Sequence, residues 1–296
     1  MSGVTISQLA PSAPLQRSRS YWAGVGRRLS RDHVTLGFAA ILLLLLIAIL
    51  AAPLLAPHDP YQTSMLRRLK PAGFAGTLLG TDELGRDMLS RLLYGGRLSW
   101  TIGITPVVIA FFVGGLLGVV AGFAGGWVNM VIMRTTDVFY AFPSVLLAVA
   151  ISGALGPGIG NAILSLSLVF IPQIIRVAET VTTSVRSLDY VEAARASGAG
   201  ALTIVPVHVL PNVLGPIFVY ATSLISVSMI LASGLSFLGL GTRPPEPEWG
   251  LMLNTLRTAI YSQPVTAMLP GLCIFATSIC FNMVSDGLRS AMDVRG

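Results

Sequence analysis

Residues with reactive side chains are sparse and widely separated in this sequence. The three histidines, His33, His58 and His208, lie far apart, and the two cysteines, Cys273 and Cys280, share one apolar run. On a helix the spacing of these cysteines is a rise of about 10 Å, whereas disulfide-bonded Cα atoms lie within about 7 Å of each other. The sequence therefore predicts no catalytic residue, no metal site and no disulfide between the two cysteines.

The chain also lacks the residues needed to bind and use ATP. A phosphate-binding loop has the pattern Gly-x-x-x-x-Gly-Lys-Ser/Thr. The only lysine, Lys70, is followed by Pro71 and is not preceded by that glycine pattern. If the protein moves a solute uphill, the energy must come from another subunit.

Composition indicates where such a chain resides. Charged residues make up 11% of the 296 residues and apolar residues 53%, whereas a soluble domain carries roughly 25% charged residues. The surface must therefore face lipid or other protein, which excludes a soluble enzyme, a disordered tail protein and a nucleic-acid binder. The net charge of +6 fits a membrane protein with arginines in its cytoplasmic loops.

The apolar runs are continuous and do not alternate, so they predict helices and not barrel strands. We expect an all-α membrane protein with six transmembrane helices. An even number of spans places both termini on one side, and the distribution of basic residues favours the cytoplasm. The first run is too long for a signal peptide and predicts a retained anchor. The expected spans are 34–56, 98–123, 138–155, 160–175, 213–240 and 265–284.

These spans divide the chain into predicted segments. A cytoplasmic tail, 1–33, precedes the first span, and an extracytoplasmic segment, 57–97, follows it. The core, 98–284, contains five spans and a cytoplasmic loop at 176–212, and residues 285–296 form a cytoplasmic tail. No ionisable residue lies inside the span cores, which disfavours an ion-coupled carrier and an intramembrane protease.

The extracytoplasmic segment is predicted to end in a surface helix. Thr81 would cap it, Asp82 and Glu83 would occupy its first turn, and Gly95-Gly96 would end it. Leu84, Met88 and Leu92 would form one apolar face along the membrane surface. The alternative is a simple connector.

Glycines at four-residue spacing mark one face of the second predicted span. Small residues on a helix face allow another helix to approach closely, which is how helices associate in lipid. This pattern predicts close packing and no chemistry. The glycines are Gly114, Gly118, Gly122 and Gly126.

The loop 176–212 is too long for a turn and predicts a helix–turn–helix on the membrane face. A short helix at 190–198 would be stopped by glycine, and a second at 201–210 would be ended by Pro211. Small residues would let the first helix dock in a groove, where Glu192 offers a carboxylate to an arginine. The alternative, a hairpin resting on lipid, would need large apolar anchors. The small residues are Ala193, Ala194, Ala196 and Gly198.

Hydroxyl groups on the fifth predicted span are candidates for a solute pathway. Thr222, Ser226 and Ser233 share a helix face, and Gln173 and Asn282 are further polar candidates. The alternative is that these hydroxyls bond to the preceding helical turn or pack between helices.

Several motifs resemble one protein family. Glu192-Ala193-Ala194, followed by Gly198 and His208-x-Leu210-Pro211, resembles the EAA loop of binding-protein-dependent ABC importer permeases. His208 replaces the usual aliphatic residue, as in the peptide-importer branch. Further matches to the C-type permease of dipeptide, oligopeptide and nickel importers are Leu79-Gly80-Thr81-Asp82-Glu83-Leu84-Gly85-Arg86-Asp87, Arg134-x-x-Asp137, Ala141-Phe142-Pro143, Glu248-Trp249-Gly250, Asp286-Gly287-Leu288-Arg289 and Asp293-x-Arg295.

This resemblance implies a type I importer permease in a bacterial cytoplasmic membrane. It implies pairing with a similar but non-identical B-type permease, with an extracytoplasmic binding protein that delivers the solute. Two ATPase subunits would bind ATP and Mg²⁺, and this chain would hold no cofactor. Residues 192–198 would be the coupling helix that fits a groove in an ATPase and passes on its movement.

The leading hypothesis is a permease subunit that imports di- or oligopeptides. Related systems import nickel chelates, glutathione, D-amino-acid peptides, opines or sugars, so the solute stays open. A second hypothesis is a non-transporting scaffold subunit of a membrane complex. A third, a self-sufficient carrier, is disfavoured by the missing intramembrane charge.

Overall fold

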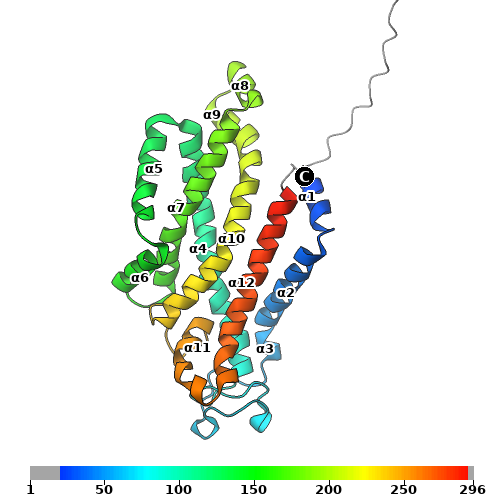
Figure 1. The fold of residues 1–296 in the computed structure, drawn as a ribbon, viewed down its shortest axis with the longest axis vertical. Helices are drawn as coiled ribbons and strands as arrows, with labels where there is room; N and C mark the ends of the chain where they lie inside the picture. The colour runs from blue at the N-terminus through cyan, green and yellow to red at the C-terminus, as the bar shows by residue number, and fades with distance from the viewer. Residues whose placement is uncertain (1–20, 293–296) are drawn as a thin grey trace, which may run out of the picture.

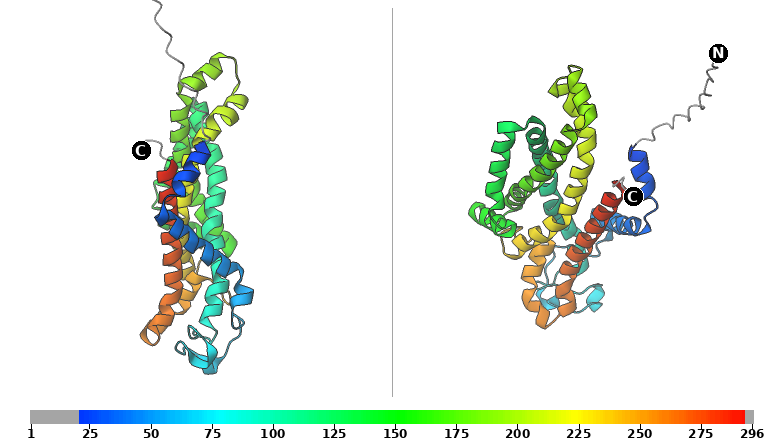
Figure 2. Two further views of the ribbon diagram at one scale, coloured as in Figure 1. Left: turned by 90° about the vertical axis from the view of Figure 1, so that its right-hand side faces the viewer. Right: turned by 45° about the horizontal axis from the view of Figure 1, so that its top comes forward.

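The computed structural model describes residues 21–292 as an elongated bundle of helices without a strand in that range (Figure 1). Turned by 90° about the vertical axis of Figure 1, the bundle is narrow (Figure 2, left). The helix α8 lies at one end, here termed the α8 end, and the segment before α4 lies at the other, the outer end. Residues 1–20 and 293–296 of the two predicted tails, with the motif Asp293-x-Arg295, lie outside the described residues.

Five helices are long and apolar enough to cross a membrane, and a bent pair brings the number to six. The expected all-α membrane architecture is thus confirmed. The helices are α1 Tyr21–Leu29, α2 His33–Leu50, α3 Ala52–Leu55, α4 Met88–Ala124, α5 Gly126–Tyr140, α6 Ser144–Leu155, α7 Ile159–Arg186, α8 Asp189–Ala196, α9 Ala201–Ile204, α10 Leu210–Phe237, α11 Trp249–Thr255 and α12 Pro264–Met292, with a π-helical turn at Val205–Val209 and 3-10 turns at Met65–Arg67, Phe74–Gly76 and Arg257–Tyr261.

The third predicted span, 138–155, is not one straight helix. Instead, α5 and α6 meet at an angle of 86°. Pro143 lies between them with a φ of −56° and a ψ of 127°, which is not helical. Helical backbone angles are also disfavoured for the residue that precedes a proline. The helix therefore breaks within the predicted span.

The fourth predicted span, 160–175, is much shorter than the helix observed. The helix α7 continues to Arg186 and carries Arg176 and Glu179 beyond the apolar run. Arg176 donates to an Asp137 oxygen at 2.6 Å, and Asn129 donates to a Glu179 oxygen at 2.6 Å, both from α5. These partners on α5 accompany the charged extension of α7. The expected loop, 176–212, is therefore shorter, since its first residues to Arg186 are helical.

Three of the four predicted packing glycines lie where α4 crosses α7. A Cβ atom at Gly118 would lie 2.6 Å from the carbonyl oxygen of Ile175, and one at Gly122 would lie 2.7 Å from that of Glu179. Gly114 faces α7 one turn earlier, next to Ile174. The two backbones are therefore in direct contact, which only glycine permits.

Gly126 does not belong to this face, and its inclusion was wrong. The helix α4 ends at Ala124, and Gly125 has a φ of +66°. Gly126 begins α5, where an added Cβ would meet no atom within 4 Å. The four-residue spacing persists in the sequence, but the chain has already left the helix.

The surface helix predicted from Thr81 to Gly95 is also wrong. The helix α4 begins at Met88, with Asp87 accepting from the Ser90 amide at 2.8 Å, and runs for 37 residues through both glycines. Thr81 is occupied elsewhere, since its hydroxyl donates to the Arg67 carbonyl. The predicted boundary at 97/98 thus falls inside one continuous helix.

A buried ion cluster explains why Asp82 does not start a helix. Its carboxylate pairs with Arg86 at 2.6 Å and with Arg91 at 3.1 Å, and it also accepts from the amides of Leu84 and Arg86 at 2.9 Å. Asp82 is fully buried, and Arg86 and Arg91 are almost so. Since charges are buried only when paired and hydrogen-bonded, this cluster fixes the loop against the start of α4.

The glycines Gly95 and Gly96 make room for the segment before α11. Trp249 donates its indole N–H to the Leu92 carbonyl at 2.9 Å, and a Cβ at Gly96 would lie 2.9 Å from the Trp249 ring. Glu248 caps α11 by accepting from the amides of Gly250 and Leu251 at 2.8 and 2.9 Å. Burial raises the pKa of Glu248, and these two hydrogen bonds oppose that rise.

The contact between α4 and α7 leads to a prediction about stability. Gly118→Leu and Gly122→Leu should each destabilise the chain by about 1–3 kcal/mol or more, because the new side chain must displace α7 backbone. The midpoint of thermal denaturation of the detergent-purified chain measures this effect. Gly153→Leu is the matched control, since its Cβ would meet nothing within 4 Å. Equal midpoints for all three variants would contradict the packing.

The ion cluster at the outer end leads to a second prediction. Asp82→Asn should destabilise the chain by about 3–5 kcal/mol, because it leaves two buried guanidinium groups without their shared carboxylate. Thermal denaturation again measures the loss. Asp59→Asn, an exposed carboxylate in the same segment, should change stability little. A similar small effect at Asp82 would show that the cluster does not hold the segment.

Candidate functional site

The helix α8 projects from one end of the bundle (Figure 1). Asp189 and Glu192 occupy its first turn and Arg195 its last, which suits the helix dipole at both ends. Gly198 follows with a φ of +85°, a conformation that glycine adopts without strain, and the Ala199 amide donates to the Ala194 carbonyl at 3.1 Å. The helix therefore ends close to where its sequence predicted.

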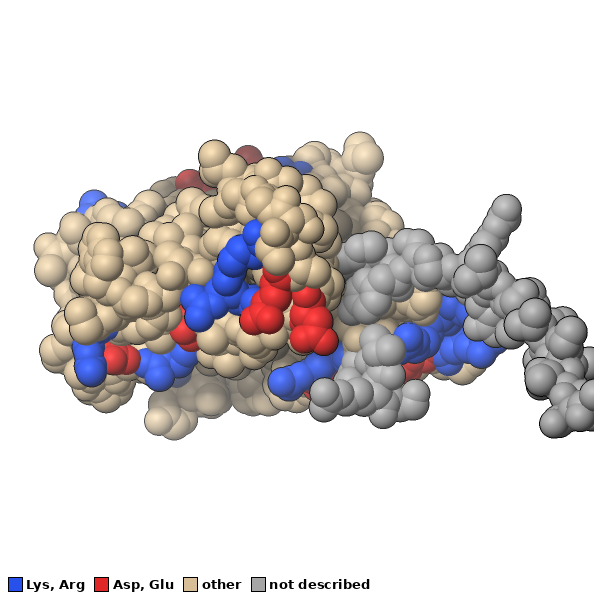
Figure 3. All heavy atoms as spheres, turned by 90° about the horizontal axis from the view of Figure 1, so that it is seen from above, with Lys and Arg blue, Asp and Glu red and all other residues tan. Residues whose placement is uncertain are grey.

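The candidate docking residues form the outward surface of α8. Glu192, Ala193, Ala196 and Gly198 are exposed, and Ala194 is half-buried. Seen from this end, charged side chains of both signs gather on a largely uncharged surface (Figure 3). The result is a small knob with short side chains and two exposed carboxylates, those of Asp189 and Glu192, which can enter a groove in a partner.

Contacts that the sequence analysis missed hold α8 on the bundle. The Tyr190 hydroxyl accepts from the Asn212 side chain at 3.1 Å, and Asn212 also donates to the His208 carbonyl at 2.8 Å. The Tyr190 and His208 rings lie 6.3 Å apart. These residues tie α8 to the start of α10. The sequence motif singled out His208, but no spacing pattern predicted that Tyr190 and Asn212 would contact each other.

A second set of contacts ties the end of α7 and α8 to the end of α4. Arg186, the last residue of α7, donates to the Phe123 carbonyl at 3.1 Å, and the guanidinium of Arg195 on α8 lies 6.0 Å from the centre of the Phe123 ring. Val191, on the inner face of α8, is fully buried. The knob is therefore connected to the two long helices α4 and α10 and is not a free loop.

The second helix of the expected helix–turn–helix does not end at Pro211. The structure has one helical path, Ala201–Phe237, that includes the π-helical turn. Pro211 falls in the first turn of α10, directly after the wider π-helical turn. A proline has no backbone N–H to donate, and the first turn of a helix tolerates this loss. This path runs directly from the knob into the fifth predicted span.

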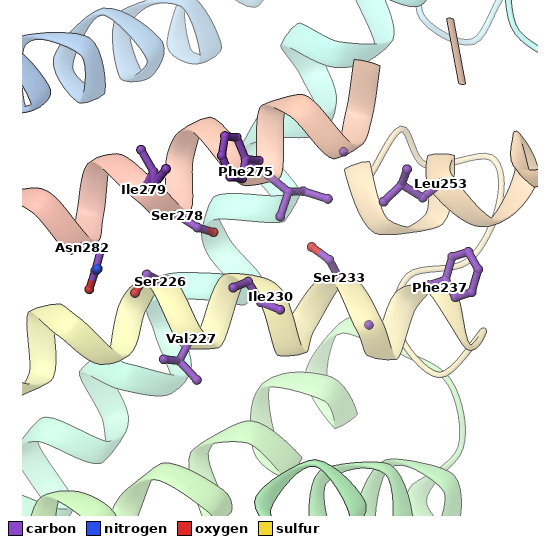
Figure 4. Close-up of a pocket in the computed structure, with 13 residues that line it drawn as sticks. Ser226, Val227, Ile230, Ser233, Phe237, Leu253, Phe275, Ser278, Ile279 and Asn282 are labelled. Carbon is purple, nitrogen blue, oxygen red and sulfur yellow. The ribbon is translucent and has the colours of Figure 1, made fainter. Parts of the chain in front are cut away.

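Three of the five pathway candidates line one groove between α10 and α12. Ser226, Ser233 and Asn282 border a cavity of about 680 Å³ together with Ser278 (Figure 4). In this view Asn282 points toward α10, and Ser233 points toward α12. Ser278 was missed by the sequence analysis, although it lies one helical turn from Asn282.

The serine hydroxyls in this groove also bond within their own helix. Ser226 donates to the Ser223 carbonyl and Ser233 to the Met229 carbonyl, each at 2.8 Å. This is the alternative that the sequence left open. Each hydroxyl oxygen still has lone pairs that can accept from a solute. The remaining lining is apolar and includes Ile230, Phe237 and Phe275.

Thr222 and Gln173 lie outside this cavity. The Thr222 hydroxyl lies 2.7 Å from the Val219 carbonyl and 3.1 Å from the Ser285 hydroxyl, so it joins α10 to α12. Gln173 lies on α7 in a separate cavity of about 330 Å³. The five candidates therefore do not form one site. Within residues 21–292, no group of three or more histidine, cysteine or acidic side chains could hold a metal ion.

Comparisons with known proteins identify matching families and relatives of this chain. The family described as "Binding-protein-dependent transport system inner membrane component" matches residues 114–295, and "N-terminal TM domain of oligopeptide transport permease C" matches residues 20–72. A glutathione transport system permease protein of Pectobacterium atrosepticum is 39% identical over 275 residues, which are 93% of this chain and 91% of that protein.

Two further relatives are named for peptide transport. A di/tripeptide transport system permease protein of Pseudomonas aeruginosa is 43% identical over 263 residues, 87% of each chain. A dipeptide transport system permease protein of Alkalihalophilus pseudofirmus is 39% identical over 275 residues, 93% of this chain and 90% of that protein. With these matches and a bundle of apolar spans, the chain belongs to the inner-membrane permease subunits of binding-protein-dependent ABC importers.

Proposed function

We propose that this permease subunit imports di- or oligopeptides and that α8 is its coupling helix. The observation that carries the proposal is the small exposed knob at α8, which is joined to α4 by Phe123 and to α10 by one continuous helical path. A force on such a knob reaches the groove between α10 and α12 through packed helices. Partner ATPase subunits, which bind ATP and Mg²⁺, supply that force, and this chain catalyses no reaction.

In this proposal the α8 end faces the cytoplasm and the outer end faces the binding protein. The basic residues Arg27 and Arg28 of α1 support this orientation, because arginine favours the cytoplasmic side. Both chain termini then lie in the cytoplasm. The Asp82 cluster presents a folded extracytoplasmic surface on which a binding protein can rest.

A second, B-type permease completes the pathway. The groove between α10 and α12 carries exposed Ile230 and Phe275 beside its serines, and a paired permease would cover these side chains on one side while lipid surrounds the rest. The groove then becomes one wall of a shared passage between the two permeases.

A peptide is the solute that fits both the polar groups of this groove and the names of the similar proteins. The serine hydroxyls and the Asn282 amide are neutral partners for peptide N–H and C=O groups, which bind through hydrogen bonds without a fixed charge. The relatives are named for dipeptides, di/tripeptides and glutathione, which is itself a small peptide. The shared chemistry of these solutes is the amide group.

The coupling role predicts the effect of reversing one charge. Glu192→Lys should reduce ATP-dependent peptide uptake at least tenfold, because a lysine would repel the arginine expected in the ATPase groove. Uptake of a radiolabelled dipeptide into proteoliposomes that contain the whole importer measures this effect. Co-purification of the ATPase subunits in detergent reports assembly separately.

Glu192→Gln is the matched control for that experiment. It removes the charge without adding a repulsive one, so its loss of uptake should be smaller. Arg31→Gln, an exposed arginine in the loop after α1, should leave uptake unchanged. Normal uptake by Glu192→Lys would remove α8 from the coupling pathway.

The orientation predicts which residues a membrane-impermeant reagent can reach. In a variant with Cys273 and Cys280 replaced by serine, Tyr261→Cys at the outer end should react with an impermeant maleimide in intact cells, since Tyr261 is 93% exposed. Glu192→Cys should react only after the membrane is opened. The reverse pattern would invert the proposed topology.

A further inference from the structure

A second cavity lies along the same line of contact between α10 and α12, here termed the seam, and is closer to the α8 end. Its volume is about 410 Å³, and α7 forms its third wall. It lies one helical turn beyond the first cavity on both helices: the lining passes from Ser226 to Ser223 on α10 and from Asn282 to Ser285 on α12. The Thr222–Ser285 contact at 3.1 Å marks the level where the two cavities adjoin.

This second cavity differs from the first because it contains charges of both signs. Asp286 and Arg289 of α12 line it, and both are exposed. They form no ion pair with each other or with another residue in the range 21–292. Other charged residues at this end do pair, as Asp137 does with Arg176 at 2.6 Å.

The spacing of these two charges suits the two ends of a short peptide. Residues three apart on a helix have Cβ atoms about 5–6 Å apart, and a peptide of two residues spans at most about 7 Å. An ammonium group can bind the Asp286 carboxylate while a terminal carboxylate binds the Arg289 guanidinium, which favours two-point contact with a carboxylate.

The rest of the cavity suits the middle of such a molecule. The Ser223 hydroxyl donates to the Tyr220 carbonyl at 2.7 Å, so its half-buried oxygen can still accept from a peptide N–H. Ser285 is buried and lies 3.1 Å from both the Val219 carbonyl and the Thr222 hydroxyl, so it holds α12 against α10. Pro216 and Val219 give apolar wall. A volume of about 410 Å³ lies within the roughly 300–1,000 Å³ range of small-molecule sites.

We propose that this cavity is an exit site that binds a small zwitterionic peptide, with its ammonium group at Asp286 and its carboxylate at Arg289. The inference rests on the proposed function for its solute class and for the cytoplasmic location of the α8 end. It adds a specific requirement: the free charged termini of the peptide are recognised at this site, whereas the first cavity between α10 and α12 offers only neutral groups.

The test measures binding of radiolabelled alanyl-alanine to the full importer in lipid nanodiscs, without ATP and without the binding protein. Asp286→Asn and Arg289→Gln should each weaken binding at least tenfold. The double exchange Asp286→Arg with Arg289→Asp should bind more tightly than either single variant, because the peptide can bind in the reverse direction. Arg31→Gln is the charge control and should bind like the wild type.

Competition with a capped peptide tests the role of the termini directly. N-acetyl-alanyl-alaninamide has the same amide groups but no end charges, so it should fail to displace alanyl-alanine. Equal displacement by the capped peptide, unchanged binding by both single variants, or no binding by the wild type would overturn the exit site.

A zwitterionic phospholipid headgroup has the same pair of charges and is the other source of this chemistry. Binding of alanyl-alanine should be the same in nanodiscs of phosphatidylglycerol alone and in nanodiscs that also contain phosphatidylethanolamine. If phosphatidylethanolamine is retained through Asp286 and Arg289 and the dipeptide does not displace it, the site belongs to lipid and the inference is wrong. ATP-driven uptake by the wild-type importer tests the proposed function separately, since uptake without binding here would overturn only the exit site.

Discussion

The direct backbone contact between α4 and α7 is the constraint on which the remaining arrangement depends. In lipid, helices gain little from hiding apolar surface and associate through close packing, and Gly114, Gly118 and Gly122 remove the side chains that would keep these two helices apart. Helix α4 extends the full 37 residues from the outer end to the α8 end. The pair therefore acts as a stiff support against which the other helices lie.

Each end of this support is fixed by different chemistry. At the outer end, the buried Asp82 carboxylate pairs with Arg86 of the same loop and with Arg91 of α4, and so fixes the loop to the start of that helix. At the α8 end, Arg186 bonds to the Phe123 carbonyl and Arg195 lies over the Phe123 ring. Contacts near α8 thus reach the same helix whose other end carries the segment before α4.

The helices α10 and α12 stand beside this support and form the groove that we propose as one wall of the solute pathway. Their seam changes in character along its length. Near the outer end it carries serines among apolar residues, and near the α8 end it carries two opposite charges, Asp286 and Arg289, that do not pair with each other. Since α10 continues the helical path that begins beside α8 at Ala201, the knob and the seam are mechanically one element. In the proposed function, a movement of α8 passes along this path to the groove.

The sequence by itself determined the membrane class, the helical architecture, the knob at α8 and the glycine face, because these depend on composition and on local periodicity. Only the tertiary structure decided where helices begin and bend. Asp82 could have started a helix, but Arg86 and Arg91 claim its carboxylate; Gly95 and Gly96 could have ended one, but Trp249 packs in the space that they leave. The grouping of Ser226, Ser233 and Asn282 without Thr222 or Gln173 also depends on how α12 lies against α10. Such outcomes depend on partners distant in the chain, which local spacing does not specify.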